Sequence, residues 1–187
     1  TNQQGSAVAI GFTAGQTNQQ GSAVAVGYQA GKTSQGYAGV GVGSGAGQTS
    51  QGDYGVAIGN IAGYQSQGTE ATAVGDAAGA TAQGHEAVAV GHLAGFTSQG
   101  PFGVTVGAYS GQSSQGRGGI AIGGYAGFNA QGANAIAIGS SSGLIGQNTF
   151  SIAIGTTAAS SNQFSNAISI GFQAGQTFQN QGAVAIG

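Results

Sequence analysis

The segment Gly139-Ser140-Ser141-Ser142-Gly143 has the glycine–serine–glycine spacing of a nucleophile elbow. In hydrolases the elbow places a serine on a sharp turn between a strand and a helix, and a histidine and an acid elsewhere in the chain activate it. Here both glycines belong to a repeat that runs through the whole chain, and no helical pattern follows them. We therefore expect no catalytic residue and no enzymatic activity.

Two histidines, His85 and His92, are the other candidates for chemistry, and Glu86 lies beside the first. A zinc site needs three or four converging ligands, whereas both histidines fall in variable positions of the repeat. The four acidic residues form no ladder of the kind that stacked calcium sites require. Cysteine is absent, which removes disulfides and thiolate ligands. We expect neither a metal nor a cofactor.

The repeat is 16 residues long throughout the chain, as from Gly11 to Gly27. We call one repeat a coil. A glycine marks it at Gly11, Gly27, Gly43, Gly59, Gly75, Gly91, Gly107, Gly123, Gly139, Gly155, Gly171 and Gly187. A constant period of this length indicates one structural unit stacked on copies of itself. We predict a single continuous repeat domain over residues 1–187 with no evident capping repeat. Exposed strand edges at its two ends would favour end-to-end stacking.

The composition is extreme, with 41 glycines in 187 residues and only 3% charged residues. Such a bias alone is typical of low-complexity, disordered chains. However, 23 of the 25 Val and Ile residues fall in two columns of the repeat, three places and one place before the periodic glycine. A disordered chain has no reason to keep apolar residues in phase, so the pattern predicts a folded repeat.

The net charge of −2 comes without a basic stripe, so we expect no nucleic-acid partner. No apolar run approaches the roughly 20 residues of a membrane helix, so we expect no membrane insertion.

Each coil contains two short strand patterns. Residues 7–11 alternate between small and β-branched side chains, which indicates a strand. An Ala-Gly pair suited to a tight corner follows, and then a second extended stretch such as residues 17–19. We predict an all-β fold, a parallel β-solenoid (β-roll) of about twelve coils. At about 4.8 Å per coil it would be a rod roughly 55–60 Å long.

Glutamine recurs with the same period as the glycine. We predict that these side chains point inward with the threonine two places before each, and that their amides bond along the rod as an internal ladder. The glutamine ladder comprises Gln19, Gln35, Gln51, Gln67, Gln83, Gln99, Gln115, Gln131, Gln147, Gln163 and Gln179.

The first strand of each coil admits few residue types on either face, since one face carries Val or Ile and the other only small residues. We expect small residues inside the narrow coil and the two Val/Ile columns, here called the Val/Ile stripe, outside. The inverse arrangement, with Val and Ile inside, remains the alternative. An exposed stripe predicts an interface between copies of the chain. It includes Val8, Ile10, Val24, Val26, Val56, Ile58, Val88, Val90, Ile120, Ile122, Ile136, Ile138, Ile152, Ile154, Ile168 and Ile170.

Aromatic residues gather near the corner that follows the first strand. They are Phe12, Tyr28, Tyr64, Phe96, Tyr109, Tyr125, Phe128 and Phe172. Such an edge can stack on glycan rings or pack against a neighbouring rod.

The phrases at residues 134–139, 151–155 and 166–171, each ending in a small–Ile–small–Ile–Gly or similar run, resemble the head repeats of YadA-type trimeric autotransporter adhesins and related viral fibre proteins. The resemblance covers all twelve coils through five or six residues in each. It implies a left-handed β-roll, trimers with the Val/Ile positions at their centre, and an extracellular, cell-surface or virion-surface location. The uniform period and the glutamine ladder depart from that family's pattern.

These features favour a non-enzymatic structural protein, the shaft or head of a surface fibre, with copies of itself as partners in a trimer or filament. One alternative is an adhesin head that binds matrix protein or glycan. A second is ice binding by the threonine column, although inward-pointing threonines and the interruptions at Gln65 and Ile145 count against it. The column contains Thr17, Thr33, Thr49, Thr81, Thr97 and Thr177.

Overall fold

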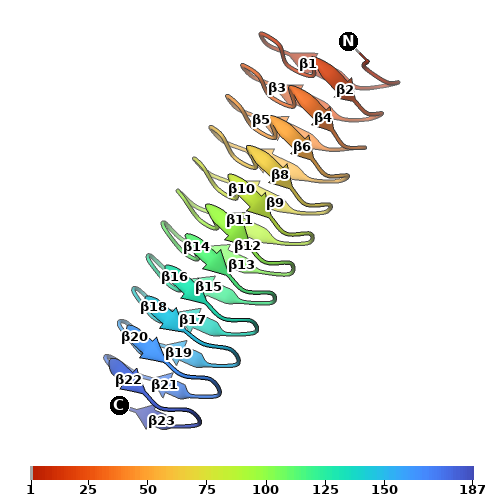
Figure 1. Ribbon diagram of the computed structural model, residues 1–187. Coiled ribbons are helices and arrows are strands. Elements are labelled where there is room, and N and C mark those ends of the chain that lie inside the picture. The colour runs from red at the N-terminus through yellow and green to blue at the C-terminus, as the bar shows by residue number, and fades with distance from the viewer. Residues whose placement is uncertain (1) are drawn as a thin grey trace.

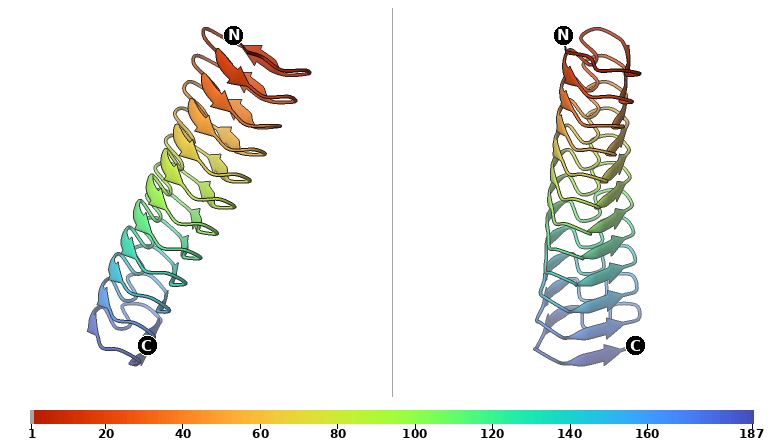
Figure 2. Two further views of the ribbon diagram at one scale, coloured as in Figure 1. Left: turned by 45° about the vertical axis from the view of Figure 1, so that its right-hand side comes forward. Right: turned by 90° about the vertical axis from the view of Figure 1, so that its right-hand side faces the viewer.

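The computed structural model describes residues 2–187, which wind into an elongated rod with the two termini at opposite ends (Figures 1 and 2). Each full coil contributes two three-residue strands joined by two corners. The odd-numbered strands form one sheet of 12 strands and the even-numbered strands form another of 11. No helix that could cross a membrane occurs in this described part of the chain.

The 12-stranded sheet contains the alternating small and β-branched residues. Its strands are β1 (Val8–Ile10), β3 (Val24–Val26), β5 (Val40–Val42), β7 (Val56–Ile58), β9 (Thr72–Val74), β11 (Val88–Val90), β13 (Val104–Val106), β15 (Ile120–Ile122), β17 (Ile136–Ile138), β19 (Ile152–Ile154), β21 (Ile168–Ile170) and β23 (Val184–Ile186).

The 11-stranded sheet contains the glutamines. Its strands are β2 (Thr17–Gln19), β4 (Thr33–Gln35), β6 (Thr49–Gln51), β8 (Gln65–Gln67), β10 (Thr81–Gln83), β12 (Thr97–Gln99), β14 (Ser113–Gln115), β16 (Asn129–Gln131), β18 (Ile145–Gln147), β20 (Ser161–Gln163) and β22 (Thr177–Gln179).

All strand pairs are parallel and keep a register of one repeat, so that Val8 pairs with Val24 and Gln19 with Gln35. The corners are bonded in the same way: the Gly27 amide donates to the Ile10 carbonyl at 2.8 Å, and the Gln29 amide to the Phe12 carbonyl at 2.9 Å. Strands and corners therefore both satisfy their backbone groups by stacking. The predicted parallel β-solenoid, with one repeat in each coil, is confirmed.

The periodic glycine is required by the close approach of successive coils. Gly75 has a φ of +131°, and a Cβ added there would lie 2.7 Å from the carbonyl oxygen of Gly91 in the next coil. Any side chain would meet both the backbone strain and this collision. The same steric limit applies at each periodic glycine from Gly11 to Gly171, which explains why this column of the sequence is invariant.

The interior is filled by small side chains and glutamine. Ala57, Ala73 and Ala89, one from each of three successive strands of the 12-stranded sheet, are fully buried. They pack with corner alanines such as Ala62 and Ala78. A coil of this size has room only for small residues at these positions, the largest being the buried Thr105, which confines Val and Ile to the outer face of the sheet.

Several residues other than glycine adopt left-handed backbone angles at fixed positions of the repeat. Asn18, Ser22 and Gln29 have φ of +53°, +60° and +56°, and equivalent residues repeat these values along the rod. The conformation costs about 1–2 kcal/mol for a residue with a side chain. The hydrogen bonds between coils, such as that of the Ser22 amide to the Gly5 carbonyl at 3.2 Å, hold it in place.

Candidate functional site

The glutamine ladder lies inside the rod. All eleven side chains are at most 6% exposed, although Gln3 in the first coil is exposed. Gln131 illustrates the bonding: its Nε2 donates to the carbonyls of Ile120 and Ala135 at 2.8 and 3.2 Å. It also donates to Oε1 of Gln147 at 3.1 Å. Each glutamine thus ties the two sheets of its coil together, and some also link one coil to the next.

The links between coils are not uniform along the ladder. They join Gln19 to Gln35, Gln51 to Gln67, and then every successive pair from Gln115 to Gln179. In the middle of the rod the Oε1 atoms of Gln83, Gln99 and Gln115 are buried without a hydrogen-bond partner. A buried unsatisfied polar atom costs about 1–3 kcal/mol. The amide ladder is therefore weakest between Gln67 and Gln115.

The Val/Ile stripe lies on the outer face of the 12-stranded sheet. In strand β17 the central Ala137 is fully buried while Ile138 beside it is 36% exposed. The same pattern of a buried small residue flanked by accessible β-branched ones recurs in every strand of this sheet from β3 to β21. All sixteen stripe residues predicted from the sequence are exposed or half-exposed on this face.

The stripe is large for an exposed apolar surface. Two side-chain columns and twelve coils at about 4.8 Å give a patch roughly 10 Å wide and 55 Å long, or about 500 Å². Two such patches placed together would bury about 1,000 Å², which reaches the lower limit of a specific protein–protein interface. The rod therefore carries a long, flat and accessible apolar face.

Aromatic side chains form short rows along the corner after each odd-numbered strand. Tyr109 and Tyr125 stack with ring centroids 4.8 Å apart and planes 7° from parallel, and Phe12 and Tyr28 stack at 5.6 Å and 8°. Parallel rings at the spacing of the coils cover one another's faces. These rows therefore present ring edges outward, which favours packing between chains over stacking on a sugar ring.

The other aromatic residues predicted for this corner are all accessible. Phe172 is exposed, whereas Tyr64, Phe96 and Phe128 are half-exposed. Phe128 packs against Tyr125 with ring centroids 5.6 Å apart.

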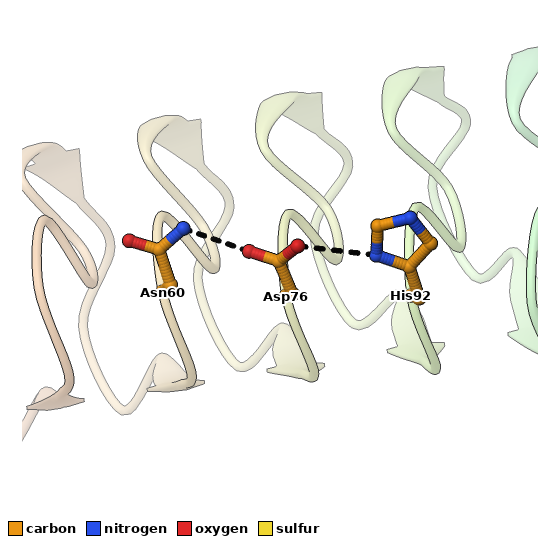
Figure 3. Close-up of polar contacts among 3 residues, drawn as sticks. All are labelled: Asn60, Asp76 and His92. Atoms are coloured by element: carbon orange, nitrogen blue, oxygen red, sulfur yellow. Dashed lines mark hydrogen bonds and ion pairs between the residues drawn. The ribbon is translucent and has the colours of Figure 1, made fainter.

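A polar row occupies the same corner over three successive coils (Figure 3). The Asn60 Nδ2 donates to Asp76 Oδ1 at 2.8 Å, and Asp76 Oδ2 lies 3.1 Å from His92 Nδ1. The His92 ring also meets the ring of Tyr109 edge-on at 5.2 Å. The sequence analysis treats His92 as an isolated surface residue. His92 and Asp76 occupy the same column in successive coils, however, so their contact could have been predicted from the repeat.

The opposite corner carries a second small cluster. His85 lies 3.5 Å from Glu86, and its ring packs edge-on against Phe102 at 4.6 Å. The Arg117 guanidinium lies 5.2 Å from the centre of the same Phe102 ring, a cation–π contact. Sequence reasoning missed Phe102 and Arg117, although both fall in the corner columns shared with His85 and Glu86. Within residues 2–187 no three His, Cys, Asp or Glu side chains gather as metal ligands would.

The segment with the spacing of a nucleophile elbow is an ordinary corner. Ser142 is buried and its hydroxyl donates to the Gly139 carbonyl at 2.9 Å, and strand β18 follows the corner where an elbow would have a helix. The described surface of the rod holds no pocket.

The prediction that the threonine column points into the rod with the glutamines is wrong. Thr17 and Thr177 are exposed, and Thr33, Thr49 and Thr97 are half-exposed, as is Thr81. The reason is the residue between Thr and Gln, which has a φ near +55° as in Ser34 and Ser98. A left-handed residue breaks the two-residue alternation of a strand, so Thr and Gln need not share a face.

No family model, curated protein or solved structure matches this chain. The functional argument therefore depends on the geometry of the rod.

Proposed function

We propose that this protein is a non-enzymatic structural rod, the shaft or head of an extracellular or virion-surface fibre, whose copies associate side by side through the Val/Ile stripe. The observation that supports this most directly is the placement of the stripe. The fold buries alanine and glutamine and leaves an unbroken series of β-branched side chains on the outside of one sheet, where water would otherwise contact them.

The energetics favour association along the whole face. Two such faces placed together reach the area of a specific interface, and association would remove from water the apolar side chains that each rod exposes. A flat sheet face adds little ordering cost because its strands are already fixed by their neighbours.

The construction of the rod also suits a spacer. Strands and corners are bonded from each coil to the next, so that the backbone is rigid along its length. The resemblance to trimeric autotransporter heads and viral fibres, noted from the phrases of the repeat, supports the same surface-exposed role.

The direct test is the mass of the full chain in solution, by sedimentation equilibrium, together with negative-stain electron microscopy. We expect a complex of two or more copies whose rods lie side by side. A chain that stays monomeric at all concentrations tested, seen as single isolated rods, would overturn the proposal.

Ice binding is a second candidate, because the structure leaves the threonine column accessible on the outer face of the 11-stranded sheet. Threonine and serine lie at neighbouring positions of the adjacent strands β4 and β6 and again in β12, although Gln65 in β8 and Ala82 in β10 interrupt this hydroxyl array. Thermal hysteresis of concentrated protein, reduced when Thr49 and Thr97 are replaced by valine, would support it. An unchanged freezing point at high concentration would rule it out.

A further inference from the structure

The Val/Ile stripe changes composition part-way along the rod. In strands β1 to β13 its fourteen positions hold eleven valines, two isoleucines and Thr72. In strands β15 to β21 all eight positions are isoleucine, and we call residues 120–170 the isoleucine segment. Each isoleucine offers one more methylene to a partner than valine does, so the same face is more apolar there.

The charges follow the same division. All six charged residues lie at or before Arg117, and residues 118–187 contain none. The part of the rod before the isoleucine segment therefore carries the net charge of −2. Two copies placed side by side in register would repel each other over that part, because Asp53, Glu70 and Asp76 would lie level with the same residues of the second copy. Over residues 118–187 no such repulsion arises.

The glutamine ladder divides at the same place. Its four consecutive links from Gln115 to Gln179 support the isoleucine segment from inside the rod. Upstream the links are isolated, and five Oε1 atoms from Gln19 to Gln115 are left without partners. A continuous amide ladder holds successive coils in one geometry, so the isoleucine face is already ordered before a partner arrives.

From these three coincident features we infer that the isoleucine segment is the energetic centre of the contact between copies of this chain. The inference rests on the proposed side-by-side association and adds where its binding energy is concentrated. The occupant is the same face of a second copy. The whole stripe reaches the area that a specific interface needs, whereas its valine part contains the Thr72 hydroxyl and lies beside the charged corners.

The test compares matched substitutions in the two parts of the stripe. Ile138 and Val42 are both 36% exposed, and each is the last residue of its strand. Ile138→Asp and Val42→Asp therefore perturb the isolated rod alike, which thermal unfolding would verify. By sedimentation equilibrium we expect Ile138→Asp to raise the dissociation constant at least about tenfold more than Val42→Asp.

A second pair of variants avoids introduced charge and keeps the fold. Replacing Ile122, Ile138, Ile154 and Ile170 by valine should weaken association at least several-fold. Replacing Val26, Val42, Val90 and Val106 by isoleucine should strengthen it, because the extra methylenes extend the isoleucine face.

The two failures can be told apart. If the wild-type chain associates but Val42→Asp weakens it as much as Ile138→Asp, the isoleucine segment is not the centre of the interface and this inference is wrong while the proposed function stands. If the wild-type chain never associates, the proposed function itself fails and this inference fails with it.

Discussion

The Gln131 side chain donates to Oε1 of Gln147, one coil further along, at 3.1 Å inside the rod. The same Nε2 group bonds the carbonyls of Ile120 in β15 and of Ala135 just before β17, two neighbouring strands of the 12-stranded sheet. One buried amide therefore joins the two sheets and two successive coils. In most soluble folds such a position would be filled by an apolar side chain, but here the narrow interior brings many backbone carbonyls close together.

Replacing Gln131 by alanine should destabilise the rod strongly. The change removes three hydrogen bonds, opens a cavity in the narrow interior and leaves Oε1 of Gln147 buried without a donor, which alone costs about 1–3 kcal/mol, whereas the Ala135 carbonyl still accepts from the Ile120 amide. We expect a loss of at least about 3 kcal/mol in the free energy of unfolding, measured by denaturant titration. Gln176→Ala, which removes an exposed glutamine, is the control and should change stability by less than about 0.5 kcal/mol. Equal effects of the two variants would show that the internal bonds contribute little.

Gly91→Ala should be among the most damaging single substitutions. Gly91 has a φ of +129°, and the new Cβ would lie 2.8 Å from the carbonyl carbon and oxygen of Gly107. We expect a loss of more than about 3 kcal/mol or failure to fold, followed by circular dichroism and thermal unfolding. Gly124→Ala is the matched control, since its new Cβ would have no atom nearer than the Ala108 carbonyl oxygen at 4.0 Å. A folded Gly91→Ala rod with unchanged stability would contradict the steric argument.

Ala130→Gly should stabilise the rod, whereas most alanine-to-glycine substitutions destabilise a protein. Ala130 is exposed and has a φ of +58°, which costs about 1–2 kcal/mol for a residue with a Cβ. Glycine removes that strain but loses about 0.5–1 kcal/mol through greater freedom of the unfolded chain. We expect a net gain of up to about 1 kcal/mol in the free energy of unfolding, measured by denaturant titration. Ala133→Gly, three residues on and outside the left-handed region, should instead lose stability, and a loss at both sites would refute the prediction.

The polar row at Asp76 should contribute little to stability. Asp76 and His92 are about half exposed, so their attraction is screened by solvent and amounts to about 0–1 kcal/mol. We expect Asp76→Asn to shift the free energy of unfolding by less than about 0.5 kcal/mol, because asparagine can still bond its neighbours. A loss of more than about 1 kcal/mol in thermal or denaturant unfolding would exceed what an exposed pair supplies and would show that the row stabilises the rod.

Much of the architecture could be predicted from the sequence because each position of the repeat occurs again in every coil, so the residue types it accepts can be compared. The alternation around Ala25 predicted strand β3 and its buried face, and the constant glutamine predicted an inward amide at Gln35. Each signal is reinforced in every coil, so chance variation at one coil does not obscure it.

The features that escaped prediction depend on backbone angles and side-chain reach. The threonine column was placed wrongly because the left-handed angle at residues such as Ser34 cannot be read from strand alternation. The contact of Arg117 with Phe102 depends on how a long side chain crosses from one coil to another. The gap in the amide ladder near Gln99 depends on small differences in distance that residue identity does not encode.

The direction of the bonds between coils has a mechanical consequence. Backbone bonds such as that from the Gly27 amide to the Ile10 carbonyl connect one coil to the next along the axis, so a pull on the two ends of the rod stretches them directly. Each released coil would add one repeat of chain, or about 50–60 Å when fully extended. Under tension the rod would therefore lengthen in equal steps and act as an extensible tether.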